Sequence, residues 1–362
     1  MDYSGYELDC FFDRVAKSDG LVCYGAGRRF RDFEEYLGST VAGQKTLYCV
    51  DKDICKQGTL IPFNGRQIEV FPPEKLAECA GNNMVVLVTN YRYDQVQAYL
   101  GERGLLSGIQ VYNFTHILGA VLENRAMQKE IPQQCHITAE PVIPKVIHYC
   151  WFGRNPIPER YRKWMDSWRK FCPDYEIKEW NEDNYDVTKN AYMYEAYQSK
   201  KWGFVPDYAR LDLIYTYGGI YLDTDVELVQ NLDDLLYQPG FAGFESEKSV
   251  ALGLGFGAVA KLEEIEELRN MYNSLHFINS DGSLNLTPSP VYQSDFLKKR
   301  GLRVNGEYQR VGNITVYPEK MFAGKSMYNR QTRLKPYTRS IHHYDASWLE
   351  EDERTFLGCE KS

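Results

Sequence analysis

Two aspartates, Asp223 and Asp225, form the pattern in this chain with the clearest chemical potential. They follow the apolar run Gly219–Leu222, which is typical of a buried strand. Side chains at positions i and i+2 lie on the same side of an extended chain, so both carboxylates can reach one ligand. Carboxylate oxygens suit Mg²⁺ or Mn²⁺, and Mg²⁺ usually binds through one or two carboxylates together with substrate phosphates. The pattern therefore predicts a site for Mn²⁺ or Mg²⁺ and a diphosphate.

A helix is expected immediately before this strand. Pro206 suits its first turn, and Gly218 with Gly219 suits its end. Asp207 and Arg210 fall on one face of that helix at a spacing of i, i+3. If the two side chains only pair with each other on the surface, the contact contributes about 0.2–0.5 kcal/mol. A second role for the pair is that the planar guanidinium of Arg210 orients a ligand.

Three ordered segments give the chain a resemblance to glycosyltransferase family 32 and, more distantly, to the glucosyltransferase domains of large clostridial toxins. The segments are Ile143–Gly153, Phe204–Leu228 and His342–Trp348. The resemblance covers roughly residues 142–348. It implies a GT-A fold and transfer of a hexose from a nucleotide-sugar with retention of the anomeric configuration. The expected donor is above all a UDP-sugar, with GDP-mannose as an alternative.

The resemblance also implies how the donor is bound. Trp151, just past the first strand, is expected to stack on the base, as an aromatic ring at a strand end can. Asp207 and Arg210 are expected to hold the hydroxyl groups of the donor sugar. Ser347 and Trp348 are expected to contact the diphosphate.

A histidine near the C-terminal end is a candidate third ligand of the metal. Imidazole beside two carboxylates can complete such a site, and His342 and His343 point in opposite directions if the chain is extended. The register against the toxin relatives favours His343, with His342 as the alternative. The expected metal ligands are thus Asp223, Asp225 and one histidine. The expected catalytic residues are Asp223, Asp225 and Arg210.

The first 118 residues predict a separate Rossmann-like domain with a parallel α/β sheet. Gly25 and Gly27 match the first two glycines of a dinucleotide-binding turn, and Asp51 lies where an acidic residue could bind a ribose. Phe30 occupies the third glycine position, so two interpretations stay open: a bound nucleotide, or a domain that packs on its neighbour or holds a partner. The expected strands are Leu21–Tyr24, Leu47–Val50, Met84–Val88 and Ile109–Tyr112.

The predicted fold class is α/β throughout. The expected organisation is a Rossmann-like domain at 1–118, a helix and linker at 119–141, a GT-A type α/β glycosyltransferase domain at 142–350, and a tail at 351–362. The proline-containing stretch before residue 145 suggests the boundary, near Glu140. Strands that alternate with helices favour parallel sheets in the first domain.

The composition of the chain bears on its partners, its metal sites and its cellular compartment. A net charge of −8 argues against a nucleic-acid partner, which requires a basic surface. The nine cysteines are scattered without a Cys-x-x-Cys pair, which indicates a reducing compartment and no zinc site. The polar start of the sequence is unlike a signal peptide, and no apolar run is long enough to span a bilayer. A cytoplasmic enzyme of bacterial type is expected.

The expected function is a metal-dependent, retaining glycosyltransferase of capsular or other polysaccharide biosynthesis. Its acceptor would be an oligosaccharide or a lipid-linked glycan, and the latter would bring peripheral association with a membrane. Two alternatives stay open. One is a phosphotransfer enzyme of the haloacid dehalogenase type, whose motif also follows a strand, although Glu227 occupies its fifth position. The other is a non-catalytic sugar-nucleotide-binding or scaffold protein.

Overall fold

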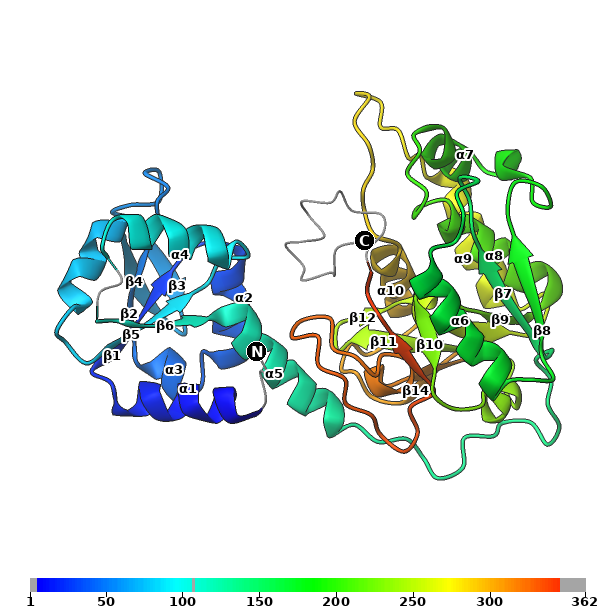
Figure 1. Cartoon of the computed structure of the whole chain (residues 1–362), viewed down its shortest axis with the longest axis horizontal. Coiled ribbons are helices and arrows are strands. Elements are labelled where there is room, and N and C mark those ends of the chain that lie inside the picture. The colour runs from blue at the N-terminus through cyan, green and yellow to red at the C-terminus, as the bar shows by residue number, and fades with distance from the viewer. Residues whose placement is uncertain (1–4, 106–107, 346–362) are drawn as a thin grey trace. The chain divides into compact units, whose positions relative to one another are not determined.

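The computed structural model describes residues 5–105 and 108–345, and the chain forms two compact units (Figure 1). The first unit comprises Met1–Asn124 and Met327–Gln331, and the second comprises Arg125–Ser326 and Thr332–Ser362. The boundary lies inside helix α5 (Phe114–Met127), earlier than the expected boundary near Glu140. The reason is that the expected linker is fastened to the second unit, where the N–H groups of residues 137 and 138 donate to the carbonyl of residue 237.

The first unit contains the predicted parallel α/β sheet, with the strand order β3-β4-β2-β1-β5-β6. All neighbouring strands are parallel except β3 and β4. The strands are β1 (Gly20–Tyr24), β2 (Thr46–Val50), β3 (Leu60–Phe63), β4 (Arg66–Phe71), β5 (Met84–Val88) and β6 (Gln110–Asn113). The helices are α1 (Gly5–Lys17), α2 (Arg28–Leu37), α3 (Val41–Gln44), the 3₁₀ helix η1 (Pro73–Cys79), α4 (Tyr93–Glu102) and α5.

Helices cover both faces of this sheet. Leu21 and Cys23 of β1 pack into one apolar cluster with α1, α2 and α5, whereas Val22 and Tyr24 pack into another with η1 and α4. Figure 1 shows α1 and α3 on the opposite side of the sheet from α4. Burial on both faces explains why the strands are nearly continuous apolar runs rather than alternating ones.

The hairpin of β3 and β4 was not predicted. Asn64 and Gly65 connect the two strands, and both have positive φ angles, 48° and 75°. An Asn-Gly pair favours this type of two-residue hairpin turn because both central residues tolerate positive φ. The dipeptide is therefore the signal in the sequence that identifies the hairpin.

The second unit is built on a mixed sheet of eight strands in the order β14-β15-β11-β13-β9-β7-β8, with β12 beside β11. A separate antiparallel pair joins β10 and β16. The strands are β7 (Val146–Cys150), β8 (Glu176–Trp180), β9 (Gly219–Tyr221), β10 (Val226–Leu228), β11 (Gly240–Ser246), β12 (Ser249–Val250), β13 (Phe256–Ala258), β14 (Gln309–Val311), β15 (Ile314–Tyr317) and β16 (Ser340–His342).

Helices and short 3₁₀ turns connect these strands. The α-helices are α6 (Glu159–Phe171), α7 (Ala191–Gln198), α8 (Pro206–Tyr217), α9 (Glu263–Met271) and α10 (Ser289–Lys299). The 3₁₀ turns are η2 (Val187–Lys189), η3 (Asp233–Leu236), η4 (Leu252–Leu254), η5 (Tyr272–Ser274) and η6 (Glu319–Met321). Both units thus have the predicted α/β class. Within residues 5–105 and 108–345, no helix combines the length and the apolar character needed to cross a bilayer.

Helix α8 ends where the sequence predicts, and two glycines allow it to meet the sheet. Gly218 and Gly219 have φ angles of 67° and 103°, a region that side chains disfavour. A Cβ on Gly219 would lie 2.8 Å from the carbonyl oxygen of Val146 in β7. The turn therefore places β9 directly beside β7, and the buried helix α8 runs into the strand that ends at the aspartates.

Candidate metal and donor site

The parallel strands β7 and β9 bring two predicted site segments to one edge of the sheet. Ile147 pairs with Ile220, so the carboxyl ends of the two strands are adjacent. Trp151 follows β7 and Asp223 follows β9. In open α/β sheets ligands bind outside the carboxyl ends of the strands. The topology therefore places both segments where a ligand is expected.

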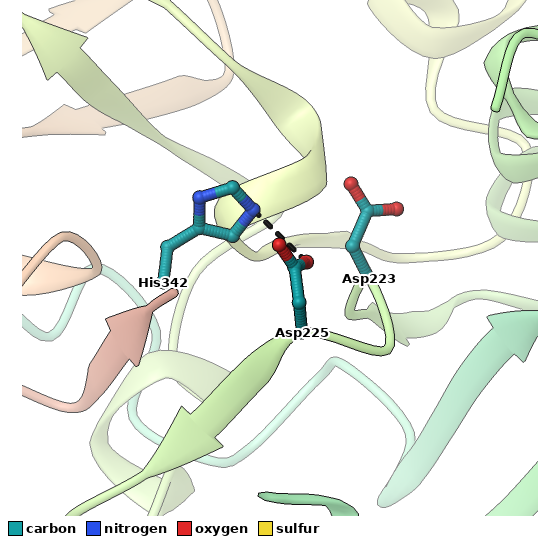
Figure 2. Close-up of side chains that lie close together, drawn as sticks. All are labelled: Asp223, Asp225 and His342. Atoms are coloured by element: carbon teal, nitrogen blue, oxygen red, sulfur yellow. Dashed lines mark ion pairs between the residues drawn. The ribbon is translucent and has the colours of Figure 1, made fainter. Parts of the chain in front are cut away.

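Asp223, Asp225 and His342 converge at this edge (Figure 2). One potential ligand atom from each side chain lies within 4.8 Å of the other two. His342 arrives from β16, which pairs antiparallel with β10, and its Nε2 lies 3.1 Å from Asp225 Oδ1. Two carboxylates and one imidazole are a donor set that suits a divalent cation, so these residues fit the metal that the sequence predicts.

His342 completes this group, and not His343, which the sequence analysis favoured as the third ligand. His343 projects away from it, and its Nε2 lies 2.9 Å from Glu227 Oε2. Its ring also stacks on Trp164, with the ring centres 4.0 Å apart. Successive side chains of an extended segment point to opposite sides, and the register of β16 against β10 decides which histidine faces the aspartates.

The electrostatics of the group show that it attracts positive charge. Burial acts to raise the pKa of Asp225, but His342 and the N–H of Asp345 outweigh it and lower that pKa to about 2. Burial acts to lower the pKa of His342, but Asp225, Asp223 and Glu245 outweigh it and raise that pKa above its usual value. These carboxylates thus favour the protonated ring of His342, whereas a metal ligand must be the neutral ring.

The two histidines give a matched test of the metal site. We expect His342→Gln to weaken Mn²⁺ binding about 10- to 100-fold, a loss at least as large as that seen when outer-shell partners of metal ligands are removed. His343→Gln should leave the affinity within about twofold, because His343 contacts Glu227 and Trp164 instead. Calorimetric titration with Mn²⁺ measures both. A larger loss in His343→Gln would assign the ligand to that residue.

Asp345 supports the metal group and was not singled out from the sequence. Its N–H donates to Asp225 Oδ2 at 3.0 Å. Its own carboxylate accepts from Arg160 at 2.7 Å and from the Tyr161 hydroxyl. Helix α6 therefore holds the segment that carries His342. In the sequence, the only indication of this supporting role is that Asp345 follows closely after His342 and His343.

Asp207 and Arg210 form a buried pair rather than a surface one. Their side chains are only 5% and 6% exposed, and Arg210 Nη2 lies 3.1 Å from Asp207 Oδ1. Arg210 also reaches Asp223 Oδ1 at 3.5 Å, so it links α8 to the aspartate turn. Burial above all, with the charge of Asp223, raises the pKa of Asp207 to about 6, although Arg210 and Ser289 oppose the shift.

This raised pKa predicts a pH dependence of stability. The pKa of Asp207 in the folded chain, about 6, exceeds its ordinary value of 3.8, so the folded chain holds an additional proton between these values. Its stabilising contribution is therefore complete below pH ~4 and is lost as the pH rises through ~6. Relative to Asp207→Asn, which cannot titrate, the metal-free wild type should lose ~2 kcal/mol of unfolding free energy between pH ~4 and ~7. Urea denaturation from pH ~4 to ~7 measures the difference, and a constant difference would contradict the prediction.

Of the three other residues that were expected to contact the nucleotide-sugar, the structure describes only Trp151. Trp151 is half-buried, its Nε1 donates to the Asn155 carbonyl at 2.6 Å, and its ring lies edge-on to Tyr161 with the centres 5.7 Å apart. The indole is thus held by its neighbours at the strand edge. Ser347 and Trp348 lie outside the residues that the structure describes.

Gly253 and Glu245 also belong to this site, although sequence reasoning did not single them out. A Cβ on Gly253 would overlap Asp223 Oδ2 and would lie 3.1 Å from Arg210 Nη1. The Gly253 carbonyl accepts from the N–H of Asp223 at 3.0 Å, so this glycine packs directly on the aspartate turn. Glu245 on β11 is a further carboxylate near Asp223 and His342, and burial raises its pKa. The glycine-rich run 253–257 was the only hint in the sequence.

The three residues of the predicted N-terminal nucleotide site also come together. Gly25, Gly27 and Asp51 line one cavity in the first unit. Phe30, at the third glycine position of the fingerprint, is fully buried in the apolar cluster beneath the turn. The departure from the fingerprint is therefore accommodated by the core of the unit.

A comparison with known protein families matches part of the second unit. Residues 158–242 match the family model described as a glycosyltransferase sugar-binding region containing a DXD motif. Inositol phosphoceramide mannosyltransferase 3 of Schizosaccharomyces pombe is 32% identical over 37% of this chain and 40% of its own length. Mannosyl phosphorylinositol ceramide synthase SUR1 of Saccharomyces cerevisiae is 26% identical over 38% of this chain and 37% of its own length.

The chain thus spans about two fifths of the length of these curated relatives. A solved structure titled PaToxG Glycosyltransferase is similar with a TM-score of 0.36 and 18% identity, over 57% of this chain and 80% of that one. The region that matches the family model, residues 158–242, includes four predicted site residues: Asp207, Arg210, Asp223 and Asp225. Residues 158–242 of this chain are therefore similar to a glycosyltransferase sugar-binding region containing a DXD motif.

Proposed function

We propose that this chain catalyses the metal-dependent transfer of a hexosyl group from a nucleotide-sugar to a hydroxyl group of an acceptor. The observation that carries the proposal is the convergence of Asp223, Asp225 and His342 within 4.8 Å, next to the buried Arg210. The family match over residues 158–242 supports glycosyl transfer over the phosphotransfer alternative. The presence of all three candidate metal ligands supports an enzyme over a scaffold protein.

Each residue of the site has a definable role in this reaction. Asp223, Asp225 and His342 would hold the cation, which when bound offsets the negative charge on the departing diphosphate. Arg210 holds Asp223 and Asp207 in place, and the carboxylate of Asp207 can accept hydrogen bonds from donor hydroxyls. Asp345 fixes the orientation of Asp225 through its N–H. Trp151 offers an aromatic surface for the base at the edge of the sheet.

The names of the relatives bear on the choice of donor and acceptor. One relative is named an inositol phosphoceramide mannosyltransferase and another a mannosyl phosphorylinositol ceramide synthase, so GDP-mannose is tested beside the UDP-hexoses. The same names favour a lipid-borne acceptor and give no support to a role in capsular polysaccharide synthesis. We include a glycolipid acceptor in the proposal, together with retention of the anomeric configuration.

The test is a screen of nucleotide-sugars with the full chain, with and without Mn²⁺. A Mn²⁺-dependent rise in melting temperature with one donor, together with slow release of its nucleoside diphosphate, is the expected result. NMR of the transfer product then reports the anomeric configuration. Phosphate release from simple phosphate esters would favour the phosphotransfer enzyme instead. Donor binding without hydrolysis or transfer to any tested sugar or lipid would favour a binding protein.

A further inference from the structure

We propose that the first unit holds a separate, metal-independent binding site for a nucleotide that carries a diphosphate. A cavity of about 580 Å³ opens at the carboxyl ends of β1, β2 and β5. This volume is within the range of about 300–1,000 Å³ that is typical of small-molecule sites. The family match at residues 158–242 lies wholly outside this unit.

The cavity lies at the point where the order of the strands changes direction. From β1 the chain moves to β2 and β4 on one side, then returns to β5 and β6 on the other. The turns after β1 and β5 are fastened together, because Thr89 Oγ1 donates to the Gly25 carbonyl at 2.7 Å. Gly25 has a φ of 108°, and a Cβ there would lie 2.7 Å from the Thr89 carbonyl oxygen. Gly25 is thus required by the fold, and open α/β sheets bind ligands at such a switch point.

Gly27, in contrast, faces open space. A Cβ on Gly27 would have no atom of the described residues within 4 Å apart from its chain neighbours, so their packing does not require a glycine at this position. Gly27 is the N-cap of the ten-residue helix α2, and no side chain caps its first turn. The first N–H groups of a helix have no partner within it and attract anions. The absence of a side chain therefore leaves room for a phosphate to approach these groups.

The side chains around the cavity are strongly cationic, although the whole chain carries a net charge of −8. Arg29 is only 5% exposed, and its Nε has no hydrogen-bond partner among the described residues. Its other nitrogens bond to Asp32 and Thr115. Asp51 and Asp53 are the acidic residues that line the cavity. The basic ones are Arg28, Arg29, Lys52, Lys56 and Arg92. This excess of positive charge at a helix N-terminus favours a diphosphate.

Asp51 has a different role from that of the ribose-binding acid of the sequence fingerprint. Its Oδ2 accepts from the N–H of Ala26 at 2.9 Å and from Lys56 at 3.0 Å, and its Oδ1 accepts from the N–H of Asp53 at 3.0 Å. Burial acts to raise the pKa of Asp51, but these three donors outweigh it and lower the pKa. Asp51 therefore holds the turn that contains Gly25 and Gly27 in place. In this proposal, the affinity for a ligand comes from the basic side chains that line the cavity.

An aromatic ring beside the phosphate site indicates that the ligand also carries a base. Tyr91 lines the cavity with 47% of its surface exposed, and the Arg29 guanidinium lies 4.3 Å from the centre of its ring. Stacking of a base on an exposed aromatic ring contributes about 1–3 kcal/mol. A nucleotide would therefore bind more tightly than pyrophosphate alone.

Calorimetric titrations of the full chain in EDTA test this proposal. The probes are ADP, UDP, NAD⁺ and pyrophosphate, and the background is Asp225→Asn, which disables the metal site of the second unit. We expect at least one nucleotide to bind, at least ~10-fold more tightly than pyrophosphate because of stacking on Tyr91. No binding of any nucleotide at millimolar concentration would overturn the proposal. Equal binding of pyrophosphate would overturn its nucleotide part.

Three variants locate the binding. Gly27→Val fills the open space over the helix N-terminus, and Lys52→Glu reverses an exposed charge at the cavity; each should weaken binding at least ~10-fold, about the cost of one lost charge-assisted contact. Lys17→Glu makes the same charge change at an exposed position at the end of α1, outside the cavity lining, and should leave binding unchanged. Equal melting temperatures show that all three fold. Unchanged affinity in both cavity variants would place the ligand elsewhere.

Discussion

Asp225→Asn is expected to abolish glycosyl transfer while the chain remains folded. We expect kcat/KM to fall by at least ~1,000-fold, because removing one preorganised contact to a developing charge already costs other enzymes about 100- to 1,000-fold. Asp225 also pairs with His342 and accepts from the N–H of Asp345, so its loss disturbs two further members of the site. Transfer of a radiolabelled sugar with saturating Mn²⁺ measures the effect.

Glu227→Gln is the matched control for this prediction. Glu227 lies two residues further along, is 37% exposed and pairs with His343, outside the metal group. Neutralising it removes the same charge two residues away from Asp225 and should leave kcat/KM within about twofold. If Asp225→Asn keeps near-native transfer, or if Glu227→Gln loses as much, the assignment of the metal site is wrong.

Gly253→Ala should lower activity without unfolding the chain. The added methyl group would overlap the Asp223 carboxylate and must displace it, because Gly253 packs against that side chain. The backbone of Gly253 does not have a positive φ, so alanine is conformationally acceptable there. We expect kcat/KM to fall about 100-fold, the cost of misplacing a reacting group by about 1 Å. The free energy of unfolding should change by less than ~1 kcal/mol.

Gly101→Ala is the control for the glycine change itself. A Cβ on Gly101, in helix α4 of the first unit, would meet no atom within 4 Å in the part of the chain that the structure describes, its own helix and chain neighbours aside. Its activity should equal that of the wild type. Measurements of kcat/KM and of chemical denaturation separate the two effects for both variants. Full activity in Gly253→Ala would show that the position of Asp223 is unimportant for turnover. Global unfolding of this variant would show that Gly253 is needed only for stability.

Local sequence rules predicted the centre of the site because its members are neighbours in the chain. A proline at the first turn, glycines at the end and an apolar run before Asp223 define helix, turn and strand without any distant contact. The pairing of Asp207 with Arg210 follows from helical spacing in the same way. The alternating strands and helices before residue 114 likewise predicted a parallel sheet, since that sheet is buried on both faces.

Tertiary structure alone decided which distant residues join that centre. His342 rather than His343 faces Asp225 because an antiparallel register between β10 and β16 selects one side of a strand more than a hundred residues away. Gly253 and Glu245 enter from elements whose position depends on the order of the sheet. The sequence by itself thus determined the fold class, the helix that carries Asp207 and Arg210, and the paired aspartates, which depend on local periodicity. The third candidate metal ligand and the packing around Asp223 required the fold, because strand register is set by long-range burial and not by neighbours in the chain.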